Sequence, residues 1–258
     1  MIDSSSVKLI ECPRDAMQGL HEFIPTASKV KYLNTVLQVG FDTIDFGSFV
    51  SPKAIPQMAD TAEVLASLDL RQTTSKLLAI IANVRGAEEA CRHAAIQYLG
   101  FPLSLSETFQ QRNTNRSIAE AFDNLREIQD LCVKHNKKLI VYLSMGFGNP
   151  YGDPYDMSYV GDFVSRLHTI GTRIISLSDT IGVSERENIS YLFSSLIPSF
   201  TDIEFGAHLY SVLAMAREKI EAAYKAGCCR FDGALKGLGG CFMAKDELIG
   251  NLVTEMMI

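Results

Sequence analysis

The sequence predicts a single-domain α/β protein, built as a (β/α)8 barrel that spans residues 1–258. Eight short apolar runs rich in β-branched residues recur along the chain, and nearly all are followed by a segment of helical period. Eight strand–helix units in about 250 residues are typical of this barrel. A doubly wound open sheet is the alternative, but the glycine-rich nucleotide fingerprint expected after its first strand is missing.

The predicted strands occupy residues 7–13, 41–49, 76–83, 94–102, 138–145, 172–180, 202–210 and 229–235. Helical segments between them include 26–40, 117–135 and 211–227. In the second, apolar residues spaced by three and four form one stripe from Ile118 to Leu131. Ser117 is placed to cap its start, and Gly227 to end the third helix. A last helix is predicted over residues 246–257.

Composition excludes several classes of partner. The net charge is −6 and no long basic run occurs, which argues against nucleic acid as a ligand. An anionic ligand must therefore be held by local cations or helix N-termini. The six cysteines form no C-x-x-C pair, and no signal peptide or membrane-spanning stretch is evident. These features predict a cytoplasmic protein with reduced thiols and no membrane contact.

Polar side chains collect where the predicted strands end. In a (β/α)8 barrel these carboxyl ends share one rim, where the chemistry is carried. A single aspartate there is usually a helix N-cap, and Arg14 beside Asp15 has an alternative interpretation as a surface ion pair. The convergence of several polar groups is harder to explain as capping. The candidate rim residues are Arg14, Asp15, Gln18, Asp45, Ser144, Asp179, Thr180, His208 and Asn251, the last in the predicted final helix.

The seventh strand carries the most informative pair. If residues 203–210 are extended, His208 and Tyr210 point to the same face. A lone histidine on an apolar strand is more often a core residue than a ligand. With Asp15 and Asn251 able to meet it, however, the rim offers a carboxylate, an imidazole and an amide oxygen. This set suits Mg²⁺ or Mn²⁺ better than structural zinc.

Six motifs together resemble 3-hydroxy-3-methylglutaryl-CoA (HMG-CoA) lyase, a TIM-barrel family of metal-dependent enzymes within the pyruvate-carboxyltransferase/HMG-CoA-lyase-like group. They lie in order over nearly the whole chain. The Arg-Asp pair alone is shared with isopropylmalate and homocitrate synthases, whereas "FVSPK-x-x-PQM-x-D" is specific to the lyases. The motifs are "IECPRDAMQ", "FVSPKAIPQMAD", "SETFQQRNTNRSI", "LSDTIGV", "GAHLYS" and "GLGGC…GNLVTE".

The resemblance implies cleavage of HMG-CoA to acetyl-CoA and acetoacetate, with Mg²⁺ or Mn²⁺ as cofactor and an acyl-CoA as substrate. It places Asp15, His208 and Asn251 at ligand positions, and Arg14 over the thioester oxygen. Family precedent also suggests a homodimer.

Further site residues follow from the same resemblance. Cys241 falls where the family's mobile lid carries a proton-shuttling cysteine, although an ordinary buried thiol is the alternative. Asp179 and Asp45 match acidic positions of the family's site, Asp45 where a glutamate is common. Gln18, Ser144 and Thr180 are expected to contact the substrate.

Three departures from the family pattern stand beside these matches. Tyr210 replaces the second histidine of an H-x-H pair, and a phenol with an ordinary pKa of about 10 is a poor ligand. Leu20 and His21 stand where the family is often basic. The segment between Cys241 and Asn251 is one residue longer than usual.

The departures leave two classes of function open. An active lyase predicts metal-dependent release of a keto acid. A barrel that binds an acyl-CoA or a partner protein without turnover predicts none. A condensing synthase is a third and weaker option.

Overall fold

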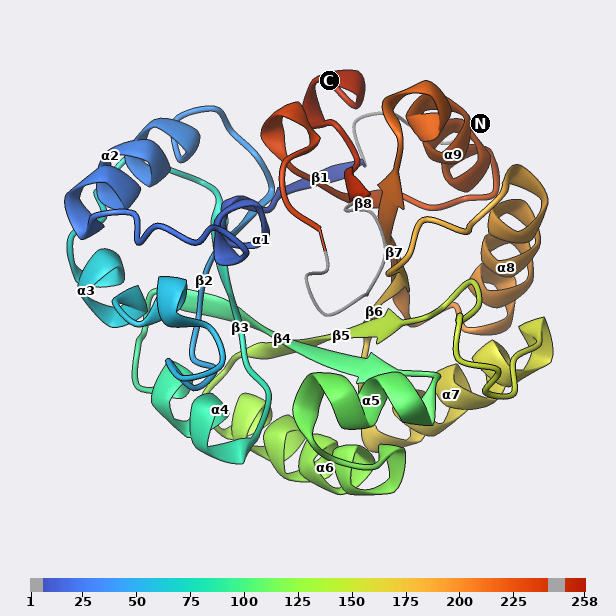
Figure 1. The fold of residues 1–258 in the computed structure, drawn as a ribbon. Helices are drawn as coiled ribbons and strands as arrows, with labels where there is room; N and C mark the ends of the chain where they lie inside the picture. Colours follow the sequence, from blue (N-terminus) through green and yellow to red (C-terminus); the bar gives the residue numbers. More distant parts are fainter. Residues whose placement is uncertain (1–6, 241–248) are drawn as a thin grey trace.

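The computed structural model describes residues 7–240 and 249–258, and these form a closed barrel of eight parallel strands surrounded by helices (Figure 1). Neighbouring strands pair in the order β6-β5-β4-β3-β2-β1-β8-β7, and β6 pairs with β7 to close the ring. This confirms the predicted fold. The strands are β1 (Lys8–Glu11), β2 (Thr43–Ser48), β3 (Lys76–Ile80), β4 (Ile96–Ser104), β5 (Lys138–Ser144), β6 (Ile174–Asp179), β7 (Glu204–Ser211) and β8 (Arg230–Gly233).

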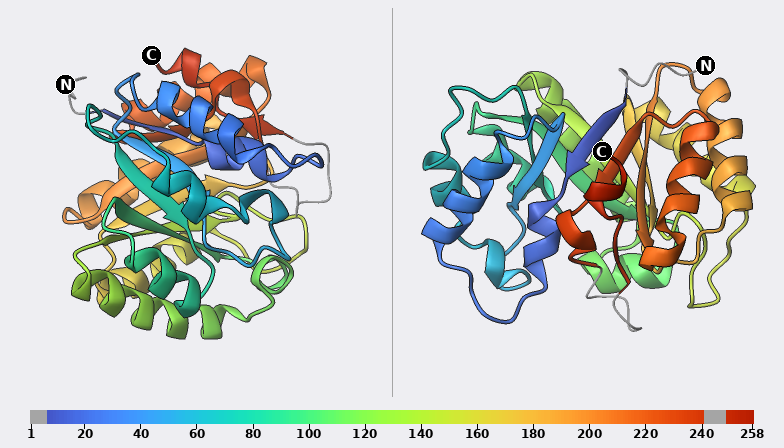
Figure 2. Two further views of the ribbon diagram at one scale, coloured as in Figure 1. Left: turned by 90° about the vertical axis from the view of Figure 1, so that its left-hand side faces the viewer. Right: turned by 90° about the horizontal axis from the view of Figure 1, so that it is seen from above.

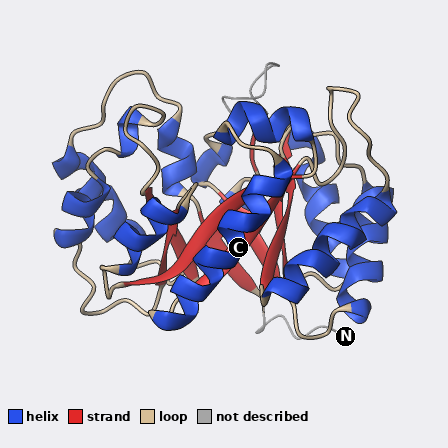
Figure 3. Cartoon of the chain, turned by 90° about the horizontal axis from the view of Figure 1, so that it is seen from below, coloured by secondary structure: helices blue, strands red, loops and turns tan. Residues whose placement is uncertain are grey.

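Helices cover the outside of the strands, as the view from below in Figure 3 shows. They are α1 (Pro13–Gln18), α2 (Thr26–Val36), α3 (Thr61–Ala66), α4 (Val84–Cys91), α5 (Glu107–Thr114), α6 (Ile118–Lys134), α7 (Met157–Ile170), α8 (Arg186–Ser199) and α9 (Leu213–Lys225). Short 3-10 turns add η2 (Pro56–Met58), η3 (Leu235–Gly237) and η4 (Thr254–Met256).

Local sequence explains the ends of these helices. Ser117 and Glu120 form a reciprocal capping box that begins α6, so the predicted cap is confirmed. At the end of α9, Gly227 adopts φ +101°, and the N–H of Cys228 bonds to the carbonyl of Ala223. This is the glycine-terminated C-cap expected from the sequence.

Alternation along the strands separates two apolar layers. In β3, Leu77 and Ala79 belong to the large core between strands and helices, whereas Leu78 and Ile80 belong to a small cluster inside the barrel. At the N-terminal end of the barrel, Arg230 is fully buried and pairs with Glu204 at 3.2 Å. These side chains fill the barrel near its N-terminal end, below the rim where the functional site lies.

The predicted final helix is wrong for the described part of that segment. Gly250–Asn251 form a two-residue strand, β9, antiparallel to β7, with Tyr210 opposite Asn251. The physical reason is a close approach: a Cβ at position 250 would collide with the carbonyl oxygen of Gly237, so the chain passes there only as an extended glycine. Figures 1 and 2 show the result, in which the C-terminal segment lies beside α1 at the rim.

Glu11 ties this C-terminal segment to β1. Its carboxylate accepts hydrogen bonds from the Leu235 N–H at 2.9 Å and from the Thr254 hydroxyl at 2.5 Å. Burial raises the pKa of Glu11 from 4.5 to about 7, against the opposing effect of these two bonds. The folded protein therefore holds a proton at Glu11 that the unfolded chain has released between these pH values.

We expect the contribution of Glu11 to the free energy of unfolding to be complete below pH 4.5 and lost as the pH rises through about 7. The upper limit of the loss is about 3 kcal/mol. Glu11→Gln keeps the shape without a charge, so denaturation followed from pH 4.5 to 8 should show a flatter profile than wild type. Glu127→Gln, which changes an exposed carboxylate on α6, is the control. Equal profiles for Glu11→Gln and wild type would contradict this account.

Candidate active site

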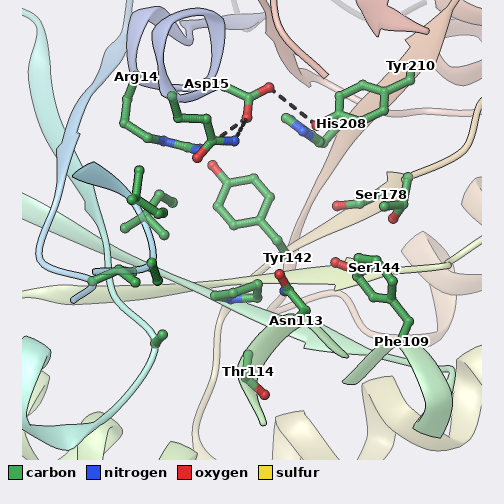
Figure 4. A pocket seen from close by; sticks show the side chains of 18 residues that line it. Arg14, Asp15, Phe109, Asn113, Thr114, Tyr142, Ser144, Ser178, His208 and Tyr210 are labelled. Atoms are coloured by element: carbon green, nitrogen blue, oxygen red, sulfur yellow. Dashed lines mark hydrogen bonds and ion pairs between the residues drawn. The ribbon is translucent and has the colours of Figure 1, made fainter. Parts of the chain in front are cut away.

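A cavity of about 260 Å³ opens at the C-terminal rim of the barrel (Figure 4). One part of its wall is polar and the other is apolar, with Val50, Ile55, Ile80 and Phe109 among the apolar side chains. Seven of the predicted site residues line it: Arg14, Asp15, Gln18, Ser144, Thr180, His208 and the doubtful Tyr210. These predicted residues therefore lie around one cavity at the C-terminal rim of the barrel.

Arg14 lies on α1, which begins directly after β1, and is held on two sides. Its Nε and Nη2 donate to Asp45 Oδ2 of β2 at 3.0 and 2.6 Å, and its Nη1 lies 3.1 Å from Asp15 Oδ1. Burial lowers the pKa of Arg14, but the two carboxylates outweigh it and the net pKa is raised. The surface ion pair considered from the sequence is thus wrong, because Arg14 and Asp15 are both buried.

Asp45 lies behind Arg14 and acts through it. Burial raises the pKa of Asp45 to about 6, although the adjacent guanidinium lowers it. The bidentate contact fixes the plane of the guanidinium, which leaves its Nη1 side directed at Asp15 and Gln18. Asp45 is accordingly a positioning residue for Arg14.

Several side chains of the rim form hydrogen bonds to the carboxylate of Asp15. Its Oδ1 accepts a bond from Gln18 Nε2 at 2.6 Å, and its Oδ2 accepts bonds from Asn251 Nδ2 at 2.6 Å and the Tyr210 hydroxyl at 3.3 Å. Asn251 reaches this point because β9 pairs with the end of β7. Its buried Oδ1 has no hydrogen-bond partner among the described residues.

His208 stands next to this cluster on β7. Its Nδ1 lies 3.2 Å from Asp232 Oδ2 of β8, and its ring packs edge-on against Tyr142 and Tyr210. Burial lowers the pKa of His208, while the hydrogen bond and charge of Asp232 raise it, and the net shift is upward. A carboxylate on one ring nitrogen orients the imidazole and leaves the other nitrogen for a ligand.

Donor chemistry at the rim fits a hard divalent cation. Asp15 offers a carboxylate, His208 an imidazole, and Asn251 an amide oxygen that no described group satisfies. Oxygen ligands with one imidazole suit Mg²⁺ or Mn²⁺, which keep several waters besides their protein ligands. Asn251 contacts Asp15, and His208 lines the same cavity as Asp15, so the three predicted ligands lie near one another, and their role as ligands stays a prediction.

Asp179 does not line the cavity, contrary to the prediction from the sequence. It was predicted to act in the site, but its carboxylate accepts bonds from the Val183 and Ser184 N–H groups and from Lys219 Nζ, each at 2.9 Å. Lys219 also donates to the Tyr210 carbonyl at 2.9 Å. Asp179 therefore links β6, β7 and α9 behind the cavity wall, and its neighbours Ser178 and Thr180 face the cavity instead.

Tyr142 and Asp232 are among the residues of the site that were not anticipated from the sequence. Tyr142 points into the cavity toward Arg14 and Asp15 (Figure 4), and its buried hydroxyl has no partner among the described residues. Its position two residues before Ser144 on β5 was the available signal, because both side chains share a face. For Asp232 the only signal in the sequence was a charged residue within an apolar predicted strand. Cys241, predicted to shuttle a proton, lies outside the described residues.

The fold and the rim site are those of a TIM-barrel enzyme. Residues 7–258 match the family model described as HMGL-like, and the chain belongs to this family. A Pseudomonas aeruginosa protein named 3-hydroxy-3-isohexenylglutaryl-CoA/hydroxy-methylglutaryl-CoA lyase is 32% identical over 250 residues, which are 96% of this chain and 82% of that protein. The hydroxymethylglutaryl-CoA lyase of Bacillus subtilis is 30% identical, with 95% and 81% covered.

Solved structures agree with this assignment. An HMG-CoA lyase from Acinetobacter baumannii, determined with coenzyme A and 3-methylmalate, superposes with a TM-score of 0.90 at 29% identity and covers 99% of this chain and 83% of that one. Within the described residues, no helix has the length and apolar character needed to cross a bilayer.

Proposed function

We propose that the protein cleaves HMG-CoA, or a close 3-hydroxyacyl-CoA, to acetyl-CoA and a keto acid, with a divalent cation at the rim. The single observation that carries this proposal is the adjacency of Arg14 to the Asp15 carboxylate, which Asn251 and Tyr210 contact. The guanidinium of Arg14 and the carboxylate of Asp15 thus lie beside a cavity with an apolar wall, which supports the proposal. Membership of the HMGL-like family supports the same reaction class.

In this proposal Asp15, His208 and Asn251 would hold Mg²⁺ or Mn²⁺. The chemistry that such a cation would supply is a lower pKa of the substrate's 3-hydroxyl and a fixed orientation of that group. The 3-hydroxyl loses its proton to water at the open rim. Breaking the C2–C3 bond then converts the 3-hydroxyl carbon into a ketone and leaves the electron pair on the thioester fragment as an enolate. Arg14 then stabilises the charge on the thioester oxygen, because Asp45 holds its guanidinium fixed before the charge develops.

In this proposal the apolar wall of the cavity determines how the substrate lies and keeps water away from it. Ile55, Ile80 and Phe109 exclude water from the reacting carbons, and the coenzyme A portion of the substrate extends to the open rim. Ser144 and Thr180 are proposed to contact the substrate, although Thr180 Oγ1 also accepts the Met145 N–H at 2.9 Å. Return of a proton to the enolate by Cys241 stays a prediction, as do a homodimer and a cytoplasmic location.

Tyr210 weakens rather than abolishes the proposed metal site. Its hydroxyl donates to Asp15 Oδ2, so it competes for one lone pair of that ligand. We expect Tyr210→His to raise the affinity for Mn²⁺ about tenfold, since an imidazole adds a ligand and removes the competing bond. Mn²⁺ titration by calorimetry measures this.

Tyr210→Phe is the matched control, because it removes the competing bond without adding a ligand. If Tyr210→His folds and binds Mn²⁺ no better than Tyr210→Phe, position 210 does not face the metal.

Acetoacetate release from HMG-CoA by the purified protein tests the proposed function. Chelator should abolish turnover, and added Mg²⁺ or Mn²⁺ should restore it. A condensing synthase would instead consume acetyl-CoA when it is offered with a keto acid. Absence of turnover with either cation, from folded protein, would contradict the proposed reaction.

A further inference from the structure

A second cluster of ligand-type side chains lies beside the rim site. Cys12, at the start of α1, meets His208 of β7 and Asp232 of β8, and one ligand atom from each lies within 4.8 Å of the other two. Their strands are neighbours in the barrel, since β8 pairs with both β1 and β7. Among residues 7–240 and 249–258, this is the group of three that meets such a criterion, and all three are buried.

Asp232 has a buried carboxylate oxygen whose interactions are unexplained. Its side chain is only 1% exposed, and Oδ2 contacts His208 Nδ1 at 3.2 Å. Oδ1 has no hydrogen-bond partner among the described residues. A buried carboxylate oxygen without a partner is costly, so such an atom calls for an explanation by a water or an ion.

Cys12 supplies a sulfur on the same side. Its thiol makes a weak contact of 3.9 Å with the Ile10 carbonyl, which leaves the sulfur lone pairs available. Cys12 is 1% exposed, so its sulfur lies in the same buried place as the Asp232 carboxylate.

We propose that Cys12, His208 and Asp232 form a second metal site, selective for a thiophilic divalent cation such as Zn²⁺. The ligand set is one thiolate, one imidazole and one carboxylate, and a water would supply the fourth ligand that a tetrahedral zinc takes. Cation binding replaces the proton of the Cys12 thiol, so each ion bound releases one proton. The two ligand charges then balance the charge of the cation in a buried place.

The spacing suits an ion after the side chains move together. With bonds of roughly 2.3 Å to sulfur and 2.0–2.2 Å to nitrogen or oxygen, ligand atoms around one tetrahedral zinc lie about 3.3–3.7 Å apart. Ligand atoms as far apart as the observed limit of 4.8 Å must therefore approach one another by about 1 Å. His208 lines the cavity, which gives the ion a path from solvent.

His208 belongs to both sites, and this couples them. Its Nδ1 faces Asp232, whereas Asp15 lies on the rim side of the ring. A neutral imidazole offers one lone pair, so a cation bound at Nδ1 excludes one at the other nitrogen. If the rim site supports turnover as proposed above, Zn²⁺ should inhibit it in competition with Mg²⁺.

Co²⁺ is the probe that tests this site without any assay of activity. Titration of the metal-free full chain should produce a thiolate-to-cobalt charge-transfer band in the near ultraviolet, and added Zn²⁺ should remove it. Cys12→Ser and Asp232→Asn should lose the band and bind Zn²⁺ at least about tenfold more weakly. Cys229→Ser, which removes a thiol at the N-terminal end of β8, should retain it.

Circular dichroism of each variant verifies the fold. Absence of the band from folded wild type, or its persistence in Cys12→Ser, would overturn the proposal. This outcome is independent of the lyase assay, since a protein that cleaves HMG-CoA with Mg²⁺ can still fail to show a thiolate band.

Discussion

Replacing Arg14 with Met should lower kcat for HMG-CoA cleavage by about 10²–10³-fold, the usual cost of removing a group that stabilises an oxyanion. The guanidinium is preorganised by two hydrogen bonds to Asp45, so its interaction strengthens as negative charge develops on the thioester oxygen. KM should change much less, because that charge exists only near the transition state. Steady-state kinetics of the purified variant measures both constants.

Arg14→Lys separates charge from geometry. Lysine keeps the cation but cannot form the bidentate contact with Asp45, so an intermediate loss of kcat is expected. Thermal unfolding of both variants is needed as a control, since removal of Arg14 leaves Asp45 buried without its partner. A folded Arg14→Met with kcat within tenfold of wild type would show that Arg14 does not stabilise the enolate.

Asp15→Asn should reduce the affinity for Mn²⁺ by at least about 100-fold, with an equal loss of turnover at limiting metal. The change keeps the shape of the side chain but removes the charge that Gln18, Asn251 and Tyr210 all face. Turnover should recover in part at high Mn²⁺, because Asn retains one oxygen ligand. Calorimetric titration gives the Mn²⁺ affinity, and the metal dependence of the rate gives the loss and recovery of turnover.

Asp42→Asn is the matched control for this change. Asp42 is a carboxylate at the opposite end of the barrel, paired with Lys76 at 2.6 Å, so its loss leaves the rim intact. If Asp15→Asn and Asp42→Asn bind Mn²⁺ alike, the ligand set at the rim is assigned incorrectly.

The barrel was predictable because its signal is local. Each strand is a short apolar run, and each helix shows its own stripe and caps, as the capping box of Ser117 and Glu120 illustrates. The rim position of Arg14, Asp15 and His208 followed from the rule that strand ends of a barrel carry polar groups. These inferences need no knowledge of which distant residues touch.

Strand alternation explains both an error and an omission. Ser178 and Thr180 line the cavity, so Asp179 between them faces the other side, where Lys219 holds it. The same rule applied to Ser144 would have placed Tyr142 in the site. Both conclusions were available from the sequence once a single residue of each strand was assigned to a face.

Long-range contacts set the limit of prediction. Asn251 lies on a strand because Gly250 passes against Gly237 and the backbone pairs with β7, and no local pattern encodes that pairing. Asp232 joins His208 and Cys12 only through the closure of β8 between β7 and β1. Such groupings depend on the order of strands in the barrel.

Cleavage of HMG-CoA in D₂O tests the central claim most directly, because it reports the enolate itself. The account predicts equal amounts of acetyl-CoA and acetoacetate by mass spectrometry, in the presence of Mg²⁺. The acetyl-CoA should carry one deuterium in its methyl group, taken up when the enolate is protonated. Unlabelled acetyl-CoA, or free coenzyme A with intact 3-hydroxy-3-methylglutarate, would contradict a reaction through that enolate.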